Sequence, residues 1–238
     1  MFICIVDGLV TAYDLQSYQQ LAQLGDSKGC TLFGIHEGSN LLFVGSKRKL
    51  TIYQWQGIGF AALKEFVTTE TPRLIYCTAN FAIIGYKKHY EAMNLTTFTS
   101  IKICDVDREH RMMAIEIPQF PKRGSSIIIS NSLQGIMFDI TGNLLSAVNN
   151  LTTGGGGTNN SPMKEGGIPN GSLGGVNNTL NNTNPATAVV PFDSRLEWAS
   201  APLQSVCILP YLITLQGSQV EIHNVLTLSV VQTIKLTT

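Results

Sequence analysis

The feature that most constrains this chain is a repeat of about forty residues. Each copy consists of an apolar run, a short polar or glycine-containing turn, and a second run in which apolar and polar residues alternate. Two such runs around a short turn predict a β-hairpin. The five copies end, at spacings of 40, 40, 45 and 85 residues, at Leu15, Trp55, Leu95, Ile140 and Val225. A constant period of this length is typical of proteins built from stacked repeats.

Residues 149–191 explain the one long spacing. This stretch is rich in Asn, Gly and Thr and poor in apolar residues. It cannot bury enough apolar surface to offset the entropy lost on ordering, so we expect it to be a disordered insertion in a loop. Without these 43 residues the last spacing falls from 85 to 42 residues, and the period holds along the whole chain.

Further short apolar runs flank the hairpins. Four hairpins have a run before them, and each hairpin has one after it; the following runs begin at Leu21, Ala62, Ser100, Asn143 and Ser229. Four strands per unit at a period near forty are typical of a β-propeller blade. We therefore predict an all-β fold, a β-propeller with about five blades visible, some of them partial. It forms one domain over residues 1–238, interrupted by the insertion at 149–191.

The first hairpin has no strand before it. Met1 is followed at once by what corresponds to the second strand of a blade. Many propellers need six or seven blades to close, so we expect N-terminal blades to be missing from this sequence. An unclosed propeller is then expected to expose two long sheet edges.

Composition excludes several classes of function. The formal net charge is zero and only 13% of residues are charged, so no global field attracts nucleic acid or an anionic membrane. The five cysteines are widely spaced without a CxxC pair, which favours free thiols in a reducing, cytoplasmic compartment. No run of 18 apolar residues occurs, and so we expect no transmembrane segment.

Motifs for catalysis are absent from the sequence. There is no nucleophile elbow, HExxH or phosphate-binding glycine loop, and the glycine run at 154–157 lacks the Lys-Ser/Thr pair that must follow it. The acidic stretch at 105–110 is interpreted as a solvated loop, with a metal site as the minor alternative. We predict a chain that is not an enzyme and has no cofactor, metal, nucleic-acid partner or small-molecule substrate.

Two hairpin turns carry clusters of cations at equivalent positions of the repeat. The candidate binding residues are Lys47, Arg48, Lys49, Lys87 and Lys88. Adjacent blades place equivalent turns side by side, so we expect a basic patch that contacts an acidic protein or lipid phosphates. The alternative is that these cations only keep the surface soluble. Lys122 and Arg123, ahead of the fourth hairpin, are expected to reach the same region.

Several stretches resemble the citron homology (CNH) domain. They include VTAYDLQSYQQLAQL, KRKLTIYQWQG, NFAIIGYKKHYEAMNL and LEWASAPLQSVCILPYLITLQGSQVEIHNV, in the order and spacing of that family. The resemblance covers nearly the whole chain outside 149–191. It is strongest to the N-terminal CNH domain of Vam/Vps-type tether subunits of the HOPS and CORVET complexes and of the TGF-β-receptor-associated protein family.

This resemblance implies a propeller that acts in vesicle tethering before fusion at endosomes and lysosomes (vacuoles), including autophagic trafficking. It implies assembly with other tether subunits, association with a Rab-type small GTPase, and peripheral contact of a cytoplasmic protein with the membrane. In the family, further blades precede the segment matching Met1, and a clathrin-type helical repeat follows the segment ending at Thr238. Neither is present here.

Two other functions compete with this hypothesis. The chain is alternatively a CNH scaffold domain of a kinase or of a Rho-type exchange factor that regulates small-GTPase signalling. A propeller can also carry an enzyme, because one fold hosts many activities. A cluster of converging His or carboxylate side chains would favour the enzyme, and no such cluster is visible in the sequence.

Overall fold

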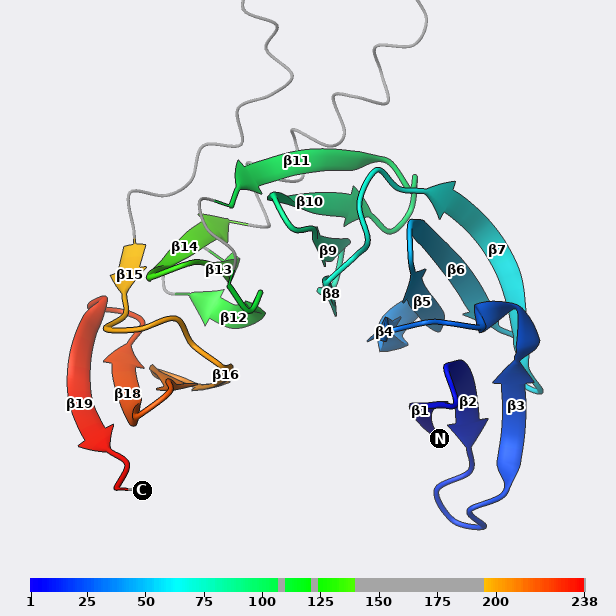
Figure 1. Ribbon diagram of the computed structural model, residues 1–238, viewed down its shortest axis with the longest axis horizontal. Helices are drawn as coiled ribbons and strands as arrows, with labels where there is room; N and C mark the ends of the chain where they lie inside the picture. Colours follow the sequence, from blue (N-terminus) through cyan, green and yellow to red (C-terminus); the bar gives the residue numbers. More distant parts are fainter. Residues whose placement is uncertain (107–109, 121–123, 140–194, 238) are drawn as a thin grey trace, which may run out of the picture.

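The computed structural model describes residues 1–106, 110–120, 124–139 and 195–237 (Figure 1). These residues form five antiparallel sheets joined by turns and two short 3-10 helices, η1 (Gly25–Ser27) and η2 (Glu37–Ser39). No helix among them has the length and apolar character needed to cross a bilayer. The predicted disordered insertion at 149–191 and the Lys122–Arg123 pair lie outside the described residues.

Each sheet follows the chain order of its strands, as a propeller blade does. The first blade contains β1 (Phe2–Val6), β2 (Leu9–Tyr13) and β3 (Gln20–Leu24). The second contains β4 (Leu32–His36), β5 (Leu41–Ser46), β6 (Lys49–Trp55) and β7 (Phe60–Val67). The third contains β8 (Leu74–Cys77), β9 (Phe81–Gly85), β10 (His89–Asn94) and β11 (Ser100–Asp105).

The last two blades flank the insertion. The fourth contains β12 (Ala114–Phe120), β13 (Gly124–Asn131), β14 (Gln134–Asp139) and β15 (Arg195–Glu197). The fifth contains β16 (Gln204–Ile208), β17 (Tyr211–Leu215), β18 (Gln219–Asn224) and β19 (Ser229–Lys235). The outer strand β15, which pairs with β14, therefore follows the insertion in the sequence. Sequence analysis assigned that place to the run at Asn143, which lies outside the described residues.

The five blades stand side by side in an arc (Figure 1). Their first strands face the middle of the arc, and β4 contacts β8, β8 contacts β12, and β12 contacts β16. The last strands, such as β7, β11 and β19, form the outer rim. This arrangement confirms the predicted all-β propeller fold with five visible blades.

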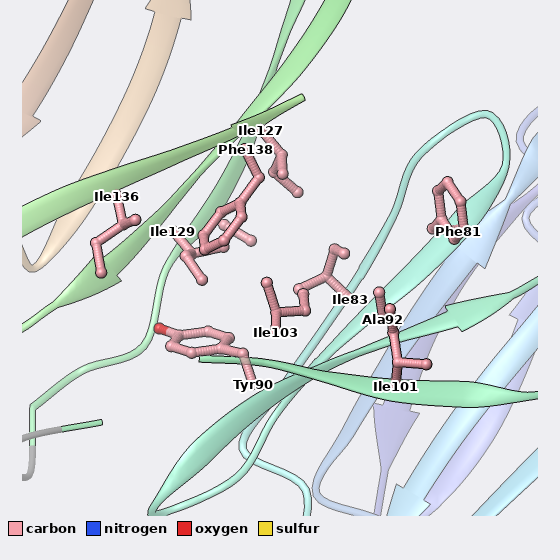
Figure 2. Packing of buried hydrophobic residues seen from close by; sticks show 11 residues of the cluster. Phe81, Ile83, Tyr90, Ala92, Ile101, Ile103, Ile127, Ile129, Ile136 and Phe138 are labelled. Atoms are coloured by element: carbon pink, nitrogen blue, oxygen red, sulfur yellow. The ribbon is translucent and has the colours of Figure 1, made fainter. Parts of the chain in front are cut away.

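The hydrophobic core lies between the blades and not within any one sheet. Figure 2 shows the cluster between the third and fourth blades, in which Ile83 and Tyr90 pack against Ile127 and Phe138. Similar clusters separate the other neighbouring blades. Because strands alternate their side chains between two faces, each inner blade supplies residues to two of these clusters.

Among the described residues, nothing covers one face of each of the two end blades. On the fifth blade Val206 is 49% exposed and Ile208 is 62% exposed, and on the first blade Phe2 and Val6 are each 38% exposed. We expected an open propeller to expose sheet edges. The structure instead exposes apolar sheet faces. Propeller blades pack face to face, so a blade that lacks a neighbour loses the cover of a face, whereas its outer edge lies on the rim whether or not a neighbour is present.

Candidate functional site

The two basic hairpins are held by equivalent backbone hydrogen bonds. Lys47 and Arg48 form the two-residue turn between β5 and β6, and Lys87 and Lys88 form the turn between β9 and β10. The Thr68 N–H donates to the Arg48 carbonyl oxygen (2.9 Å), and the Val106 N–H donates to the Lys88 carbonyl oxygen (2.8 Å). The loop leaving each outer strand therefore closes over its own turn.

Four of the five predicted side chains project into solvent. Lys47, Arg48, Lys87 and Lys88 are exposed. Lys49 differs, since its Nζ lies 2.6 Å from Oε2 of Glu65 on the neighbouring strand β7. Its charge is balanced within the blade, so Lys49 contributes less to a basic surface than its position in the sequence indicates.

The structure brings the two hairpins together at one hollow. Arg48 from the second blade and Lys87 from the third line a hollow of about 220 Å³, which also includes Arg73, Glu70 and two threonines, Thr69 and Thr71. The prediction that equivalent turns of adjacent blades meet holds for this pair of residues. We call this feature the basic hollow.

Arg73 is a member of the basic hollow that sequence analysis missed. Its backbone N–H donates to the carbonyl oxygen of Gly85 (2.8 Å), which ties the loop before β8 to the end of β9, close to the turn of the third hairpin. Thr31 makes the same bond to Gly45 one blade earlier (3.0 Å). The signal in the sequence was the position of Arg73, directly before the first strand of its blade. In both of these blades the residue at that position bonds to the hairpin of the same blade, so a cation there lies close to the basic turn.

A second hollow adjoins the basic one. It measures about 210 Å³ and is lined by apolar and aromatic side chains of the second and third blades, including Leu50, Phe66, Tyr86 and Met93. Polar groups complete the lining, among them the carboxylate of Glu91. Thr69 lines both hollows. Burial, followed by the charges of Glu91 and then Glu70, raises the pKa of Tyr86, so its hydroxyl stays protonated at neutral pH. We call this second feature the apolar hollow.

One serine–histidine contact deserves comparison with a catalytic pair. Nε2 of His110 lies 3.1 Å from Oγ of Ser130, and the Tyr90 hydroxyl lies 3.0 Å from the same atom. Ser130 is fully buried, and its Oγ also accepts a hydrogen bond from the Met113 N–H (2.8 Å). A hydroxyl enclosed in this way cannot meet a substrate. The hydrogen bond from Tyr90 on β10 to Ser130 on β13 instead fastens the third blade to the fourth.

The remaining reactive groups are packed into the fold. All five cysteines are free thiols. Burial raises the pKa of Cys77 to about 12 and raises the pKa values of Cys30 and Cys207 as well, which disfavours a thiolate nucleophile. Within the described ranges, no group of three or more His, Cys, Asp or Glu side chains is arranged to hold a metal ion. In the predicted acidic loop, Asp105 pairs with Lys102 at 2.5 Å.

These features define a class of protein: a β-propeller whose interblade grooves and surface turns are suited to binding other molecules. The sequence matches the CNH domain family over residues 1–138, which include the first three blades and most of the fourth. The chain belongs to the CNH domain family, and CNH domains are protein-interaction modules. The comparison with curated protein sequences finds no relative.

Solved structures agree on the fold. The AfRom2 CNH domain has a TM-score of 0.59 and 10% identity, with 98% of this chain and 66% of that chain covered. BamB from Moraxella catarrhalis has a TM-score of 0.58 and 10% identity, with 99% and 62% covered. The dihydro-haem d1 dehydrogenase NirN in complex with DHE has a TM-score of 0.60 and 12% identity, with 97% and 42% covered. This chain thus spans less than two thirds of the length of the latter two and about two thirds of the first.

Proposed function

We propose that this CNH domain is a non-catalytic docking module of a vesicle-tethering subunit at endosomal and lysosomal (vacuolar) membranes. The observation that carries the proposal is the pair of basic hairpins on adjacent blades, which share the basic hollow. The order and spacing of motifs such as KRKLTIYQWQG resemble the tether subunits of the HOPS and CORVET complexes. Both features suit a protein that binds acidic surfaces during membrane tethering and fusion, including autophagic trafficking.

The mechanism follows from rigidity and charge. Each hairpin belongs to a blade whose neighbours cover both faces, so the cations are presented on a fixed platform. A positive platform attracts an acidic protein or the phosphates of a membrane surface, and this attraction weakens with salt. In this proposal the platform holds other tether subunits and a Rab-type small GTPase, and the cytoplasmic protein touches the membrane peripherally.

Binding to small GTPases provides the first test. Purified chain is assayed against Rab-type and Rho-type small GTPases loaded with either GTP or GDP, at low and high salt. We expect salt-sensitive binding of a GTP-loaded Rab-type protein. Glutamate substitutions at Lys47, Arg48, Lys87 and Lys88 should weaken this binding and reduce its dependence on salt.

The control is Lys28→Glu, which reverses an exposed charge in the loop between the first and second blades. Binding of Rho-type proteins alone would contradict the tether proposal. It would favour the alternative, a CNH scaffold domain of a kinase or Rho-type exchange factor, which has the same family membership. A folded chain that binds neither class would contradict both.

A further inference from the structure

We propose that the basic and apolar hollows together form one peptide-binding groove, whose ligand is an extended acidic segment of a partner protein carrying an apolar side chain. This inference rests on the docking function proposed above and specifies the chemistry of its ligand. The two hollows lie between the second and third blades and meet at Thr69. We call the combined feature the interblade groove.

The charges of the groove favour an acidic ligand. The groove has three cationic side chains, Arg48, Arg73 and Lys87, all in the basic hollow. Against them stand two carboxylates, Glu70 in the basic hollow and Glu91 in the apolar hollow, so the formal charge of the lining is positive and is concentrated at the basic end. Arg73 and Lys87 each have another interaction partner within the chain, so we expect the exposed Arg48 to contribute most to binding. Arginine presents several donors in a planar fork that matches the geometry of a carboxylate.

Glu70 favours a polypeptide over a phosphate. Within the described part of the chain, its Oε2 atom is buried and accepts no hydrogen bond. A buried acceptor without a donor costs free energy. Because Glu70 lines the hollow, a rotation of its side chain toward a bound ligand would let a ligand N–H donate to this oxygen and relieve that cost. A peptide supplies backbone N–H donors beside acidic side chains. A phosphate dianion supplies only acceptors, so it cannot donate this hydrogen bond.

The division of the groove into two small hollows also favours a peptide. Each hollow is smaller than the roughly 300 Å³ at which pockets for small molecules usually begin. A hollow of this size suits a single apolar or aromatic anchor, the kind of residue that dominates protein interfaces. It is too small to take the acyl chains of a lipid.

The lining of the apolar hollow is already ordered. Leu50, Tyr86 and Met93 are each at most 3% exposed and belong to the cluster that joins the second blade to the third. An anchor side chain therefore meets a surface held by the core of the protein. Little conformational entropy has to be lost on binding at such a surface, which favours affinity.

Fluorescence anisotropy with defined peptides tests the proposal. The probe is a labelled synthetic peptide with one phenylalanine flanked on both sides by glutamates, and the full chain is titrated into it. Two control peptides carry lysines in place of the glutamates, or serine in place of the phenylalanine. We expect saturable binding of the first peptide only. In a separate assay without peptide, binding of the chain to vesicles that contain phosphatidylserine tests the alternative ligand, a membrane surface.

Two variants locate the binding site. Arg48→Glu reverses the main charge, and Thr69→Trp fills the junction of the hollows from an exposed loop position without changing charge. Each should weaken peptide binding roughly tenfold or more. Two matched controls, Lys28→Glu and Thr96→Trp, alter exposed residues that line neither hollow and should leave affinity within about twofold.

The outcomes separate this inference from the proposed function. Unchanged peptide binding by Thr69→Trp would overturn the groove, even if charge reversal still abolished GTPase binding. Binding of anionic vesicles in the absence of any peptide binding would overturn the peptide ligand and favour a membrane. Loss of GTPase binding in the earlier experiment, with the peptide still bound, would leave the groove in place and contradict the tether role.

Discussion

The third and fifth blades have the same strand order but different surroundings. Every residue of β9 in the third blade is buried, whereas buried residues in β17 alternate with half-buried or exposed ones. Ile83 and Ile213 occupy equivalent positions, since Ile83 pairs with Ala92 and Ile213 pairs with Ile222 in the same register. Ile83 is fully buried against the fourth blade, while Ile213 lies on the uncovered face. The same strand position is therefore buried or exposed according to whether a neighbouring blade covers it, so a blade obtains its core from its neighbours.

The closed faces of these two blades also differ in polarity. In the third blade, Ile84, Tyr86 and Met93 pack in the cluster facing the second blade. At the equivalent places of the fifth blade stand Thr214, Gln216 and His223, all buried. The carboxylate of Glu221 accepts hydrogen bonds from the side chains of Gln216 and Gln219, and His223 Nε2 lies 3.1 Å from it. The face of the fifth blade toward the fourth therefore combines a hydrogen-bonded network within the blade with apolar packing against its neighbour.

Truncating the equivalent isoleucines should produce the largest contrast. Ile83→Ala leaves a cavity in a covered core and should lower the free energy of unfolding by roughly 2–5 kcal/mol. Ile213→Ala removes a side chain that still meets solvent and should cost about 1 kcal/mol or less. Urea denaturation of each variant, followed by circular dichroism, measures the difference. Equal losses would mean that the fifth blade is covered in solution by something else.

The buried carboxylate provides the second contrast. Glu221→Gln places an amide N–H₂ group among donors, so at least one buried donor loses its acceptor, at a cost of about 1–3 kcal/mol. The equivalent Glu91, which is partly exposed and contacts His89 at 3.0 Å, serves as the matched control. Glu91→Gln should change stability by less than about 1 kcal/mol.

Tryptophan fluorescence can locate the effect of Glu221→Gln. The chain has two tryptophans. Trp198 is buried in the cluster between the fourth and fifth blades, and Trp55 lies at the end of β6 in the second blade. We expect the Trp198 signal to change at lower urea than the circular dichroism does. A single coincident transition at the wild-type midpoint would contradict the role given to the network.

The repeat made most of the fold predictable. Alternating apolar residues such as those of β6 determine which side chains face the neighbouring blade, and this local pattern is visible in any sequence. The outer strand β15 was missed, because its partner β14 lies before the insertion and a three-residue strand has almost no pattern of its own. Long-range pairings of short strands depend on the whole fold and leave no local signal.

The candidate site was predictable only in part. The equivalence of the two hairpins placed Arg48 and Lys87 near each other, since it follows from the repeat alone. It did not indicate that Lys49 pairs with Glu65, nor that Glu70 and Arg73 enter the same hollow. Those contacts depend on side-chain directions and on the path of a loop, which vary between copies of a repeat.

The smallest expected effect concerns the turn before the last strand of a blade. Oδ1 of Asn94 in the third blade and of Asn224 in the fifth accepts backbone hydrogen bonds from the residues two and three positions later. Asp14 does the same in the first blade, with bonds from the N–H groups of Gln16 and Ser17. These bonds, chiefly that from the Ser17 N–H, lower the pKa of Asp14 below its ordinary value of 3.8.

A lowered pKa means that folding favours the ionised carboxylate. The resulting stabilisation is complete above the ordinary pKa and is lost as the pH falls through the lower pKa of the folded state. Asp14→Asn keeps the turn but cannot titrate there. The difference in urea midpoint between wild type and Asp14→Asn should therefore shrink as the pH falls from about 5 through the ordinary pKa of 3.8 and below it.

The reciprocal change, Asn224→Asp, brings this test to the fifth blade. The residues that follow Asn224 in its turn, Leu226 and Thr227, are exposed, so a carboxylate can be solvated there. We expect the variant to gain the pH dependence that Asp14→Asn loses. Asn94 is only 6% exposed, and Asn94→Asp should instead destabilise the third blade because its charge is poorly hydrated. A midpoint difference that stays constant with pH in both exposed turns would mean that the carboxylate charge plays no part in closing them.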